Sequence, residues 1–211
     1  MAKVKCQISV SADGFVAGPD PSEQQPLGEG GEQLHDWVVK LAAWRQAHGL
    51  EGGEVNESTP IIEEGLTGTG AVVMGRNMFG GGPGPWGDDP WQGWWGEEPP
   101  FRVPVFVLTH HAREPLQLGE TTFHFVTDGA ERAVELALEA AGGEDVSVGG
   151  GGQTVQQCLR GGLFDELLLN QVPILLGSGT RLLEDVGGVE LEQTRVLEAP
   201  GVAHLFYAVK R

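Results

Sequence analysis

Two short glycine-containing segments each stand between a predicted buried strand and a predicted helix. The first is Gly75-Arg76-Asn77, after the run 71–74, and the second is Gly149–Thr154, after 146–148. Glycine in such a turn lets the phosphates of a ligand approach the backbone, and the N–H groups at a helix start attract negative charge. Either segment alone could be only a tight turn. Two in one chain, one of them carrying Arg76, favour a phosphate-bearing ligand.

A third polar cluster follows the apolar run 104–108. Thr109, His110, His111 and Arg113 offer a hydroxyl, two imidazoles and a guanidinium. Because ligands gather at the carboxyl ends of strands in open α/β sheets, this cluster could receive a second phosphate. The alternative is a surface loop whose adjacent histidines have no role. No histidine, cysteine or carboxylate set has the spacing of metal ligands, so no metal is expected.

The elements that must position these residues follow from hydrophobic periodicity. Strands are predicted at 4–10, 71–74, 104–108, 123–126, 146–148, 167–176, 189–197 and 202–209. Helices are predicted at 32–48, 61–66, 130–141 and 154–160, and Asp128 is expected to cap the third of them. This order predicts an α/β fold, a three-layer αβα sandwich. Its mixed, mostly parallel sheet has about eight strands, with about four helices and an antiparallel hairpin at one edge.

Length and charge narrow the class of protein. A chain of 211 residues fits a single domain over 1–211. Thirteen Lys and Arg against thirty Asp and Glu leave a net charge of −17, which argues against nucleic acid or an anionic membrane as partner. No apolar run approaches the length of a membrane span, and the first ten residues lack the apolar block of a signal peptide. A cytoplasmic protein is expected.

The segment 80–100 is an insert rich in Gly, Pro and Trp that no regular element would tolerate. It carries four of the six tryptophans of the chain: Trp86, Trp91, Trp94 and Trp95. One interpretation is a surface loop that packs its own aromatic side chains. The other is a lid or wall of a site, with Trp94 or Trp95 stacking on a flat heterocycle.

Six segments, in this order, resemble the dihydrofolate reductase family. They are residues 9–17 (SVSADGFVA), 73–76 (VMGR), 104–109 (PVFVLT), 150–152 (GGG), 163–167 (LFDEL) and 173–179 (PILLGSG). The sequence is more similar to the branch shared with the reductase domain of bacterial riboflavin biosynthesis, and the resemblance spans nearly the whole chain. It implies a dihydrofolate reductase-like fold and an NADPH-dependent reductase.

The resemblance also implies a cofactor site. Arg76 and Asn77, with Thr109 and His110, would hold the adenosine 2′-phosphate and the pyrophosphate of NADPH. Cations after two strands suit the extra phosphate that distinguishes NADPH from NADH. Met78 stands where the family usually has a threonine or serine, so one hydroxyl contact is lost. The implied cofactor residues are Ala17 near the nicotinamide, Gly75, Arg76, Asn77, Thr109 and His110, and the pyrophosphate cradle Gly150, Gly151, Gly152, Gln153 and Thr154.

For catalysis, hydride transfer to a C=N bond needs a proton donor and a dry pocket. Dihydrofolate reductases place a carboxylate on the helix after the first loop, which implies Asp36 here, with His35 as the alternative. An Asp on a helix surface without a role is the other interpretation of Asp36. Asp13 either makes a turn or, as in the riboflavin-type branch, lies along the active site. The candidate substrate contacts are Asp13, Trp37, Trp94 and Trp95.

The resulting hypothesis is an NADPH-dependent reductase of a small heteroaromatic or imine-type substrate, pterin- or folate-like or aminopyrimidine-like. Outside the cofactor region few basic residues remain for a phosphorylated substrate, Arg181 being the main exception. The resemblance to the riboflavin-type branch, whose members tend to be dimers, implies that this protein is a homodimer. The rival hypotheses are a non-catalytic nucleotide-binding or scaffold protein that keeps the fold, and an interaction module whose exposed tryptophans contact a partner.

Overall fold

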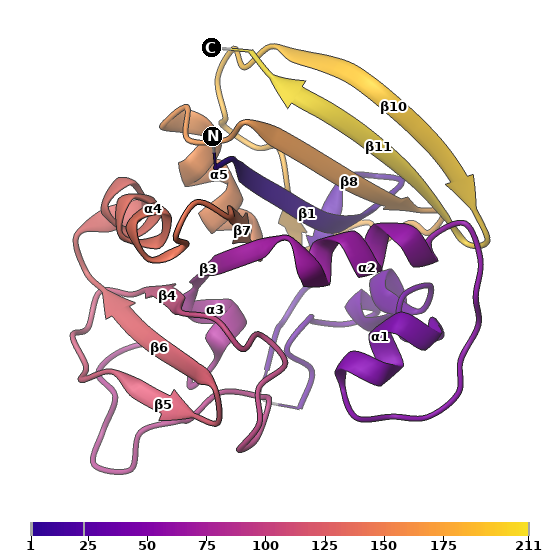
Figure 1. Ribbon diagram of the computed structural model, residues 1–211. Coiled ribbons are helices and arrows are strands. Elements are labelled where there is room, and N and C mark those ends of the chain that lie inside the picture. The colour runs from indigo at the N-terminus through magenta and orange to yellow at the C-terminus, as the bar shows by residue number, and fades with distance from the viewer. Residues whose placement is uncertain (1, 23, 211) are drawn as a thin grey trace.

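A nine-stranded sheet forms the centre of the protein, in a computed structural model that describes residues 2–22 and 24–210. The strand order is β10-β11-β8-β1-β7-β3-β4-β6-β5 (Figure 1). The strands of this sheet are β1 (Val4–Ser11), β3 (Thr69–Gly75), β4 (Val105–Leu108), β5 (Leu116–Leu118), β6 (Thr121–Val126), β7 (Asp145–Val148), β8 (Glu166–Val172), β10 (Leu191–Ala199) and β11 (Val202–Val209). Neighbours from β8 to β6 are parallel, whereas both edges are antiparallel. The carboxyl ends of the central strands therefore meet at one edge of the sheet.

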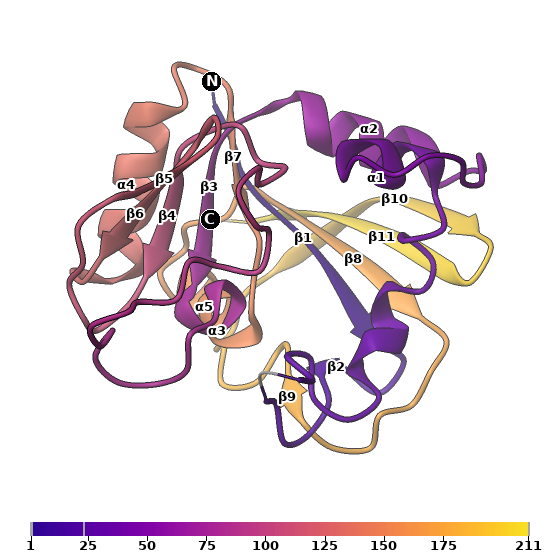
Figure 2. The ribbon, with the colours of Figure 1, turned by 90° about the horizontal axis from the view of Figure 1, so that it is seen from below.

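Helices cover both faces of this sheet. They are the 3-10 helix η1 (Gly31–His35), α1 (Ala42–Ala47), α2 (Thr59–Thr67), α3 (Arg76–Phe79), α4 (Gly129–Ala140) and α5 (Gly152–Arg160). Apolar residues of α4 and α5 share one core cluster with the strands, whereas η1 and α2 bury their apolar residues in a second cluster. Figure 2 shows α4 and the pair α1 and α2 at opposite sides of the molecule. No helix of the described ranges is long and apolar enough to cross a membrane.

A second, two-stranded sheet joins β2 (Phe15–Ala17) to β9 (Thr180–Arg181) (Figure 2). It brings the loop after β1 next to the loop after β8, although the two are far apart in the sequence. Ser11 fixes the turn between β1 and β2, because its Oγ accepts a hydrogen bond from the N–H of Phe15 at 2.9 Å.

The insert 80–100 packs on the face of β3, β4 and β6 that α4 leaves uncovered. The packing is centred on Phe79, the last residue of α3, which contacts Phe123 and Trp86 edge-on at ring distances of 5.2 and 5.8 Å. Trp95 stacks on Phe123 at 6.0 Å. Together with buried residues of the strands these rings form a third core cluster. Aromatic side chains thus cover this face of the sheet, which a helix would otherwise cover.

The predicted fold class is confirmed, as a mixed and mostly parallel sheet with helices on both faces. The sheet has one more strand than expected, because β5 was not predicted, and β5 makes the second edge antiparallel as well. Strand β8 ends at Val172 rather than at 176. Asp128 occupies the N-cap position of α4, but its side chain makes no capping hydrogen bond, so that expectation was wrong.

The helix predicted over 32–48 was also wrong. Its apolar residues Leu34, Trp37, Val38 and Leu41 are all buried in one cluster, as the spacing suggested. The backbone, however, is a 3-10 helix, a series of turns and the short α1. The cause is residue 54, which exchanges hydrogen bonds with the N–H of Ala42 and the carbonyl of Lys40. This bridge competes with the hydrogen bonds that a continuous helix would need.

Candidate functional site

The two glycine turns lie side by side at the carboxyl edge of the sheet. The N–H of Gly75 donates to the carbonyl of Gly150 at 2.9 Å, and the N–H of Gly149 donates to Val73 at 2.8 Å. A Cβ atom on Gly75 would lie 2.3 Å from Oγ1 of Thr154. The close approach of the two turns therefore requires glycine at position 75.

The start of α5 is built from backbone alone. Gly151 is its N-cap and offers no side chain, while the N–H groups of Thr154 and Val155 donate to its carbonyl at 3.0 and 3.2 Å. The N–H groups that precede Thr154 in this first turn have no carbonyl one turn earlier in the helix to bond with, and the helix dipole adds positive potential there. Gln153 is exposed and Thr154 is buried. This helix start can receive an anionic group.

The small β2–β9 sheet lies against the same helix start. A Cβ atom on Gly152 would lie 2.8 Å from Cγ2 of Thr180 and 3.1 Å from Cγ2 of Val16. Ala17, which ends β2, is therefore close to the second glycine turn. Helix η1 in turn packs against β1 and β2. The structure thus brings Ala17, the glycine turns and η1 into one region.

Arg76 opens α3, directly after the first glycine turn, and points into the insert. Its Nε donates to the carbonyl of Gly80 and its Nη2 to that of Gly81, each at 3.0 Å. The guanidinium carbon lies 3.1 Å from the centroid of the Trp86 ring. Its Nη1 is buried without a hydrogen-bond partner. Asn77, the next residue, is exposed.

The predicted loop cluster after β4 is held by hydrogen bonds within the loop, to β6 and to the insert. The N–H of Thr109 donates to Val126 at 3.0 Å, and the Thr109 hydroxyl accepts the N–H of His111 at 3.2 Å. The indole Nε1 of Trp86 donates to the carbonyl of His111 at 2.8 Å, which ties the insert to this loop. His110 is exposed. The insert is therefore hydrogen-bonded both to the loop that contains Thr109, through His111, and to Arg76.

The two candidate proton donors differ in exposure. Asp36 is exposed, whereas Nδ1 of His35 is buried and has no hydrogen-bond partner. Burial lowers the pKa of His35, although the negative charge of Asp36 acts in the opposite direction and raises it. Among the described residues, no hydrogen bond or ion pair joins either side chain to the glycine turns. Asp36 instead lines a cavity of about 370 Å³ together with Trp37.

Asp13 holds two loops together. Its Oδ1 accepts the Ser11 hydroxyl at 2.6 Å and the N–H of Leu176 at 3.1 Å, and its Oδ2 accepts the N–H of Gly177 at 2.7 Å. The Ser11 hydroxyl and these backbone donors lower the pKa of Asp13 to about 2. Asp13 is thus an ionised turn residue that fixes the loop after β8.

The three candidate tryptophans lie in different surroundings. Trp37 is 7 % exposed and its Nε1 donates to Ser9 at 3.2 Å, so it belongs to the core as well as to the cavity wall. Trp95 is half-buried against Phe123. Trp94 is 37 % exposed and contacts Trp91 edge-on at 4.7 Å. Trp94 is therefore the most exposed of the three.

A buried serine, histidine and asparagine form a chain that resembles a catalytic triad. Nε2 of His204 lies 2.8 Å from the Ser58 hydroxyl, and its Nδ1 lies 2.7 Å from Oδ1 of Asn170. The three residues are only 0, 1 and 2 % exposed, so no substrate reaches the serine. Burial, with the charge of Arg195, lowers the pKa of His204 to about 4. The chain is a structural network that joins α2, β8 and β11.

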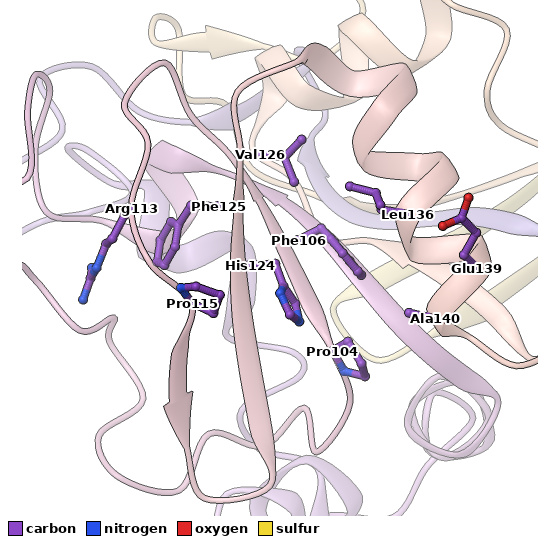
Figure 3. Close-up of a pocket in the computed structure, with 10 residues that line it drawn as sticks. All are labelled: Pro104, Phe106, Arg113, Pro115, His124, Phe125, Val126, Leu136, Glu139 and Ala140. Atoms are coloured by element: carbon purple, nitrogen blue, oxygen red, sulfur yellow. The ribbon is translucent and has the colours of Figure 1, made fainter.

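A groove of about 630 Å³ lies between α4 and the strands β4 and β6, and extends to Arg113 and Pro115 (Figure 3). Its lining residues are Pro104, Phe106, Arg113, Pro115, His124, Phe125, Val126, Leu136, Glu139 and Ala140. None of the glycine-turn residues is among them. The described residues also contain no group of three or more His, Cys, Asp or Glu that could hold a metal ion.

Sequence reasoning missed the contacts of the insert. The clustering of tryptophans was visible, but the stacking of Trp86 on Arg76 and on Arg113 was not. The signal that could have found it is the pairing of an aromatic-rich insert with Arg76, directly after β3, and Arg113, in the loop after the neighbouring strand β4.

Several solved structures share the overall fold of this chain. A solved structure from Shewanella sp. PV-4, of a protein assigned to riboflavin biosynthesis, is similar over 99 % of both chains, with a TM-score of 0.64 and 21 % identity. The riboflavin biosynthesis reductase of Saccharomyces cerevisiae is similar over all of this chain and 89 % of its own, with a TM-score of 0.53 and 13 % identity. The dihydrofolate reductase of Enterococcus faecalis, solved with NADP(H), is similar over 99 % of this chain and 97 % of its own, with a TM-score of 0.51 and 14 % identity.

These similarities show a dihydrofolate reductase-like fold. A comparison with curated protein sequences finds no match. The family model of the RibD C-terminal domain, however, matches residues 2–204. The chain therefore belongs to the RibD C-terminal domain family, a family of riboflavin biosynthesis reductases.

Proposed function

We propose that the protein is an NADPH-dependent reductase that transfers a hydride to a small heteroaromatic or imine-type substrate, pterin- or folate-like or aminopyrimidine-like. The observation that carries the proposal is the junction of the two glycine turns. Gly75 and Gly150 are joined by a hydrogen bond at the carboxyl edge of the sheet, with Arg76 next to the first turn and α5 starting at the second. Family membership supports the reductase class.

The residues present fit NADPH. In the proposal, Gly150, Gly151 and Gly152, with Gln153 and Thr154, bind the pyrophosphate through the backbone at the start of α5. Gly75 leaves the space that this approach needs. Arg76 and Asn77, with Thr109 and His110, bind the 2′-phosphate; the unpartnered Nη1 of Arg76 supports this role. Ala17 lies beside the same helix start and borders the nicotinamide.

When bound, NADPH supplies the hydride, and the chain must supply a proton and a surface for the substrate. We assign the proton to Asp36 or His35, which are the C-cap and the last residue of η1. The cavity at Asp36 and Trp37, about 370 Å³, supports a small planar substrate there. Trp94 and Trp95 of the insert are the other proposed aromatic contacts. Asp13 positions the loop 173–179 along this region.

The proposal extends to a cytoplasmic homodimer that acts on a small molecule, as expected from the sequence. Consumption of NADPH distinguishes the proposed reductase from a non-catalytic nucleotide-binding protein. The enzyme consumes NADPH in the presence of dihydrofolate, a pterin or an aminopyrimidine, whereas a protein that only binds nucleotides leaves NADPH unchanged with every acceptor.

The proton donor is tested by the variants Asp36→Asn and His35→Gln, with Glu32→Gln as a matched control on the same 3-10 helix. The donor variant should lower kcat by about 100-fold or more, and should remove one limb of the pH profile. Equal pH profiles for all three variants would show that neither side chain donates the proton.

A further inference from the structure

The loop 54–58 contributes to the wall of the cavity in which the substrate is proposed to bind. Glu54 and Asn56 of this loop both line the cavity, whose volume is about 370 Å³. The start of the loop is held by two backbone hydrogen bonds, because the N–H and the carbonyl of Glu54 are bonded to the segment 40–42 at 2.8 and 2.9 Å. The side chains of the loop are therefore presented to the cavity from a fixed backbone.

The end of the loop is anchored in the core by one imidazole, that of His204. Its Nε2 lies 2.8 Å from Oγ of Ser58, and the two residues are 0 and 1 % exposed. The same imidazole contacts the ring of Trp37 edge-on, at 5.1 Å between the centroids, and Trp37 also lines the cavity. One buried side chain thus supports both the aromatic part of the wall and the loop that carries Asn56.

Asn56 is half-buried and has one polar group left for a ligand. Its backbone N–H donates to Oγ1 of Thr59, and its carbonyl accepts the N–H of Thr59, each at 3.0 Å. Its side-chain Oδ1 accepts the N–H of Ser58 at 2.9 Å. Because an N–H bonds only to the oxygen of an amide, this contact fixes which end of the side chain is used at the start of α2. Among the described residues Nδ2 has no hydrogen-bond partner, so Asn56 offers N–H donors to a ligand.

The other polar side chains of the lining do not offer a neutral donor in the same way. Nε2 of Gln33 donates to a backbone carbonyl, and Nε1 of Trp37 donates to a serine hydroxyl, each at 3.2 Å. The charged side chains of the lining are Asp36, Glu54 and Lys40. The two carboxylates are acceptors when ionised, and the lysine is a cation. A neutral acceptor group of a ligand therefore finds its neutral partner at Asn56.

We propose that Asn56 is a specificity-determining residue of this cavity, where its Nδ2 donates a hydrogen bond to a ring carbonyl of the bound heterocycle. The proposal rests on the proposed function, which puts the substrate in this cavity, and it narrows the substrate class. Heterocycles with a ring carbonyl, such as pterins and pyrimidinones, are favoured over analogues that carry an amino group at the same position. An amino group there opposes its own N–H donors to those of Asn56, and donors left without an acceptor weaken binding.

Two probes that differ at this one position test the proposal. They are pterin, which has the ring carbonyl, and 2,4-diaminopteridine, which has an amino group in its place. Their affinities are measured by titration, followed by the fluorescence of the pteridine ring. The ratio of the two affinities is the quantity compared between variants, because effects of a substitution that are common to both probes cancel in it.

Asn56→Asp is the decisive variant. It keeps the oxygen that accepts the N–H of Ser58 and replaces the donor by an acceptor, so the affinity ratio should shift by about 10- to 100-fold toward the amino analogue. Asn56→Ala removes the donor without adding a charge and should shift the ratio in the same direction, by about 10-fold. Gln33→Glu is the matched control, since it adds the same charge to the lining and leaves Asn56 in place; it should shift the ratio far less.

Folding of the variants is checked by thermal unfolding. Asp accepts the same hydrogen bond as Asn and is favourable beside the start of a helix, so Asn56→Asp should unfold at the wild-type temperature or above it. If Asn56→Asp is not folded, the affinity ratio of Asn56→Ala decides.

The outcomes are separable from those of the proposed function, because the titrations need neither NADPH nor turnover. The role of Asn56 is overturned, even if NADPH is consumed, by a wild-type protein that binds neither probe or by an affinity ratio that Asn56→Asp leaves unchanged. It is also overturned if Gln33→Glu shifts the ratio as much as Asn56→Asp does. A shift confined to the Asn56 variants, in a protein that consumes no NADPH with any acceptor, supports the role of Asn56 and contradicts the reductase.

Discussion

Gly75 is the position where one added methyl group tests how the two glycine turns meet. Its φ of −82° and ψ of 157° suit any residue, so Gly75→Ala introduces no backbone strain. The added Cβ would lie 2.3 Å from Oγ1 of Thr154, and the next nearest atoms are 3.6 Å or more away. The whole effect therefore arises from one contact with a side chain that is only 5 % exposed.

The hydroxyl must move by about 0.7 Å to reach 3.0 Å, the lower limit of real Cβ contacts. Overpacking of this kind costs about 1–3 kcal/mol of unfolding free energy. Thr154→Ala removes the clashing atom, so the double variant should be more stable than the two single effects predict, by about 1–3 kcal/mol. Urea unfolding followed by circular dichroism measures all three variants.

Gly188→Ala is the matched control, because no atom lies within 4 Å of its added Cβ. It should change the unfolding free energy by less than about 1 kcal/mol. If Gly75→Ala is as mild as this control, or if the effects of Gly75→Ala and Thr154→Ala are additive, the two turns do not meet as described and the proposed phosphate cradle loses its geometry.

Three further predictions follow from the ionisable groups. The pKa of His204 is about 4 in the folded protein, below its usual value, so on acidification the unfolded chain takes up the proton first. The contribution of His204 to the free energy of unfolding is therefore fully present above pH about 6.5, and it declines by up to about 3 kcal/mol toward pH 4. In NMR, His204 should not titrate near its usual pKa, and a titration there would contradict the buried network. Asp13→Asn should speed the hydrogen exchange of the Leu176 and Gly177 amides at neutral pH, because the carboxylate that accepts them is ionised down to pH about 2; unchanged exchange would refute this role. Burial raises the pKa of Cys6, and that of Cys158 to about 12, so a thiol reagent at neutral pH should label neither until the protein is unfolded; rapid labelling of the native protein would show that the thiols are accessible.

Buried strands were the most predictable part of the fold. The run 71–74 is apolar on both faces, as strands in the middle of a parallel sheet are, and it forms β3. The short segment 146–148, with Val146 and Val148 on its buried face, forms β7. The antiparallel β11 was predicted over its full length, 202–209. The local sequence pattern is sufficient to predict a strand when its two neighbours in the sheet bury it.

Elements that depend on a distant partner were not predictable. The helix expected over 32–48 is interrupted because residue 54 pairs with the backbone at 40–42, and no local pattern reveals that bridge. Strand β5 is only three residues long and exists through its pairing with β6. That residues 1–211 form one domain stays a prediction.

The candidate site was predictable where strand ends define it. Gly75 and Gly149 to Thr154 follow neighbouring strands, and the structure brings them into contact. The position of a side chain on a loop is a different matter. Arg76 points toward the carbonyls of the insert, and His35 is more buried than the exposed Asp36 beside it. Such orientations arise from the packing of the insert and of η1, which spacing along the chain does not encode.

The central claim is that this fold binds NADPH at the junction of the two glycine turns. Titration of the purified protein with NADPH and with NADH, followed by tryptophan fluorescence, tests it most directly, because Trp86 lies on Arg76. The account predicts micromolar binding of NADPH and clearly weaker binding of NADH. If the protein binds neither nucleotide, the reductase hypothesis is contradicted. The tryptophan-rich insert would then be a surface for another partner.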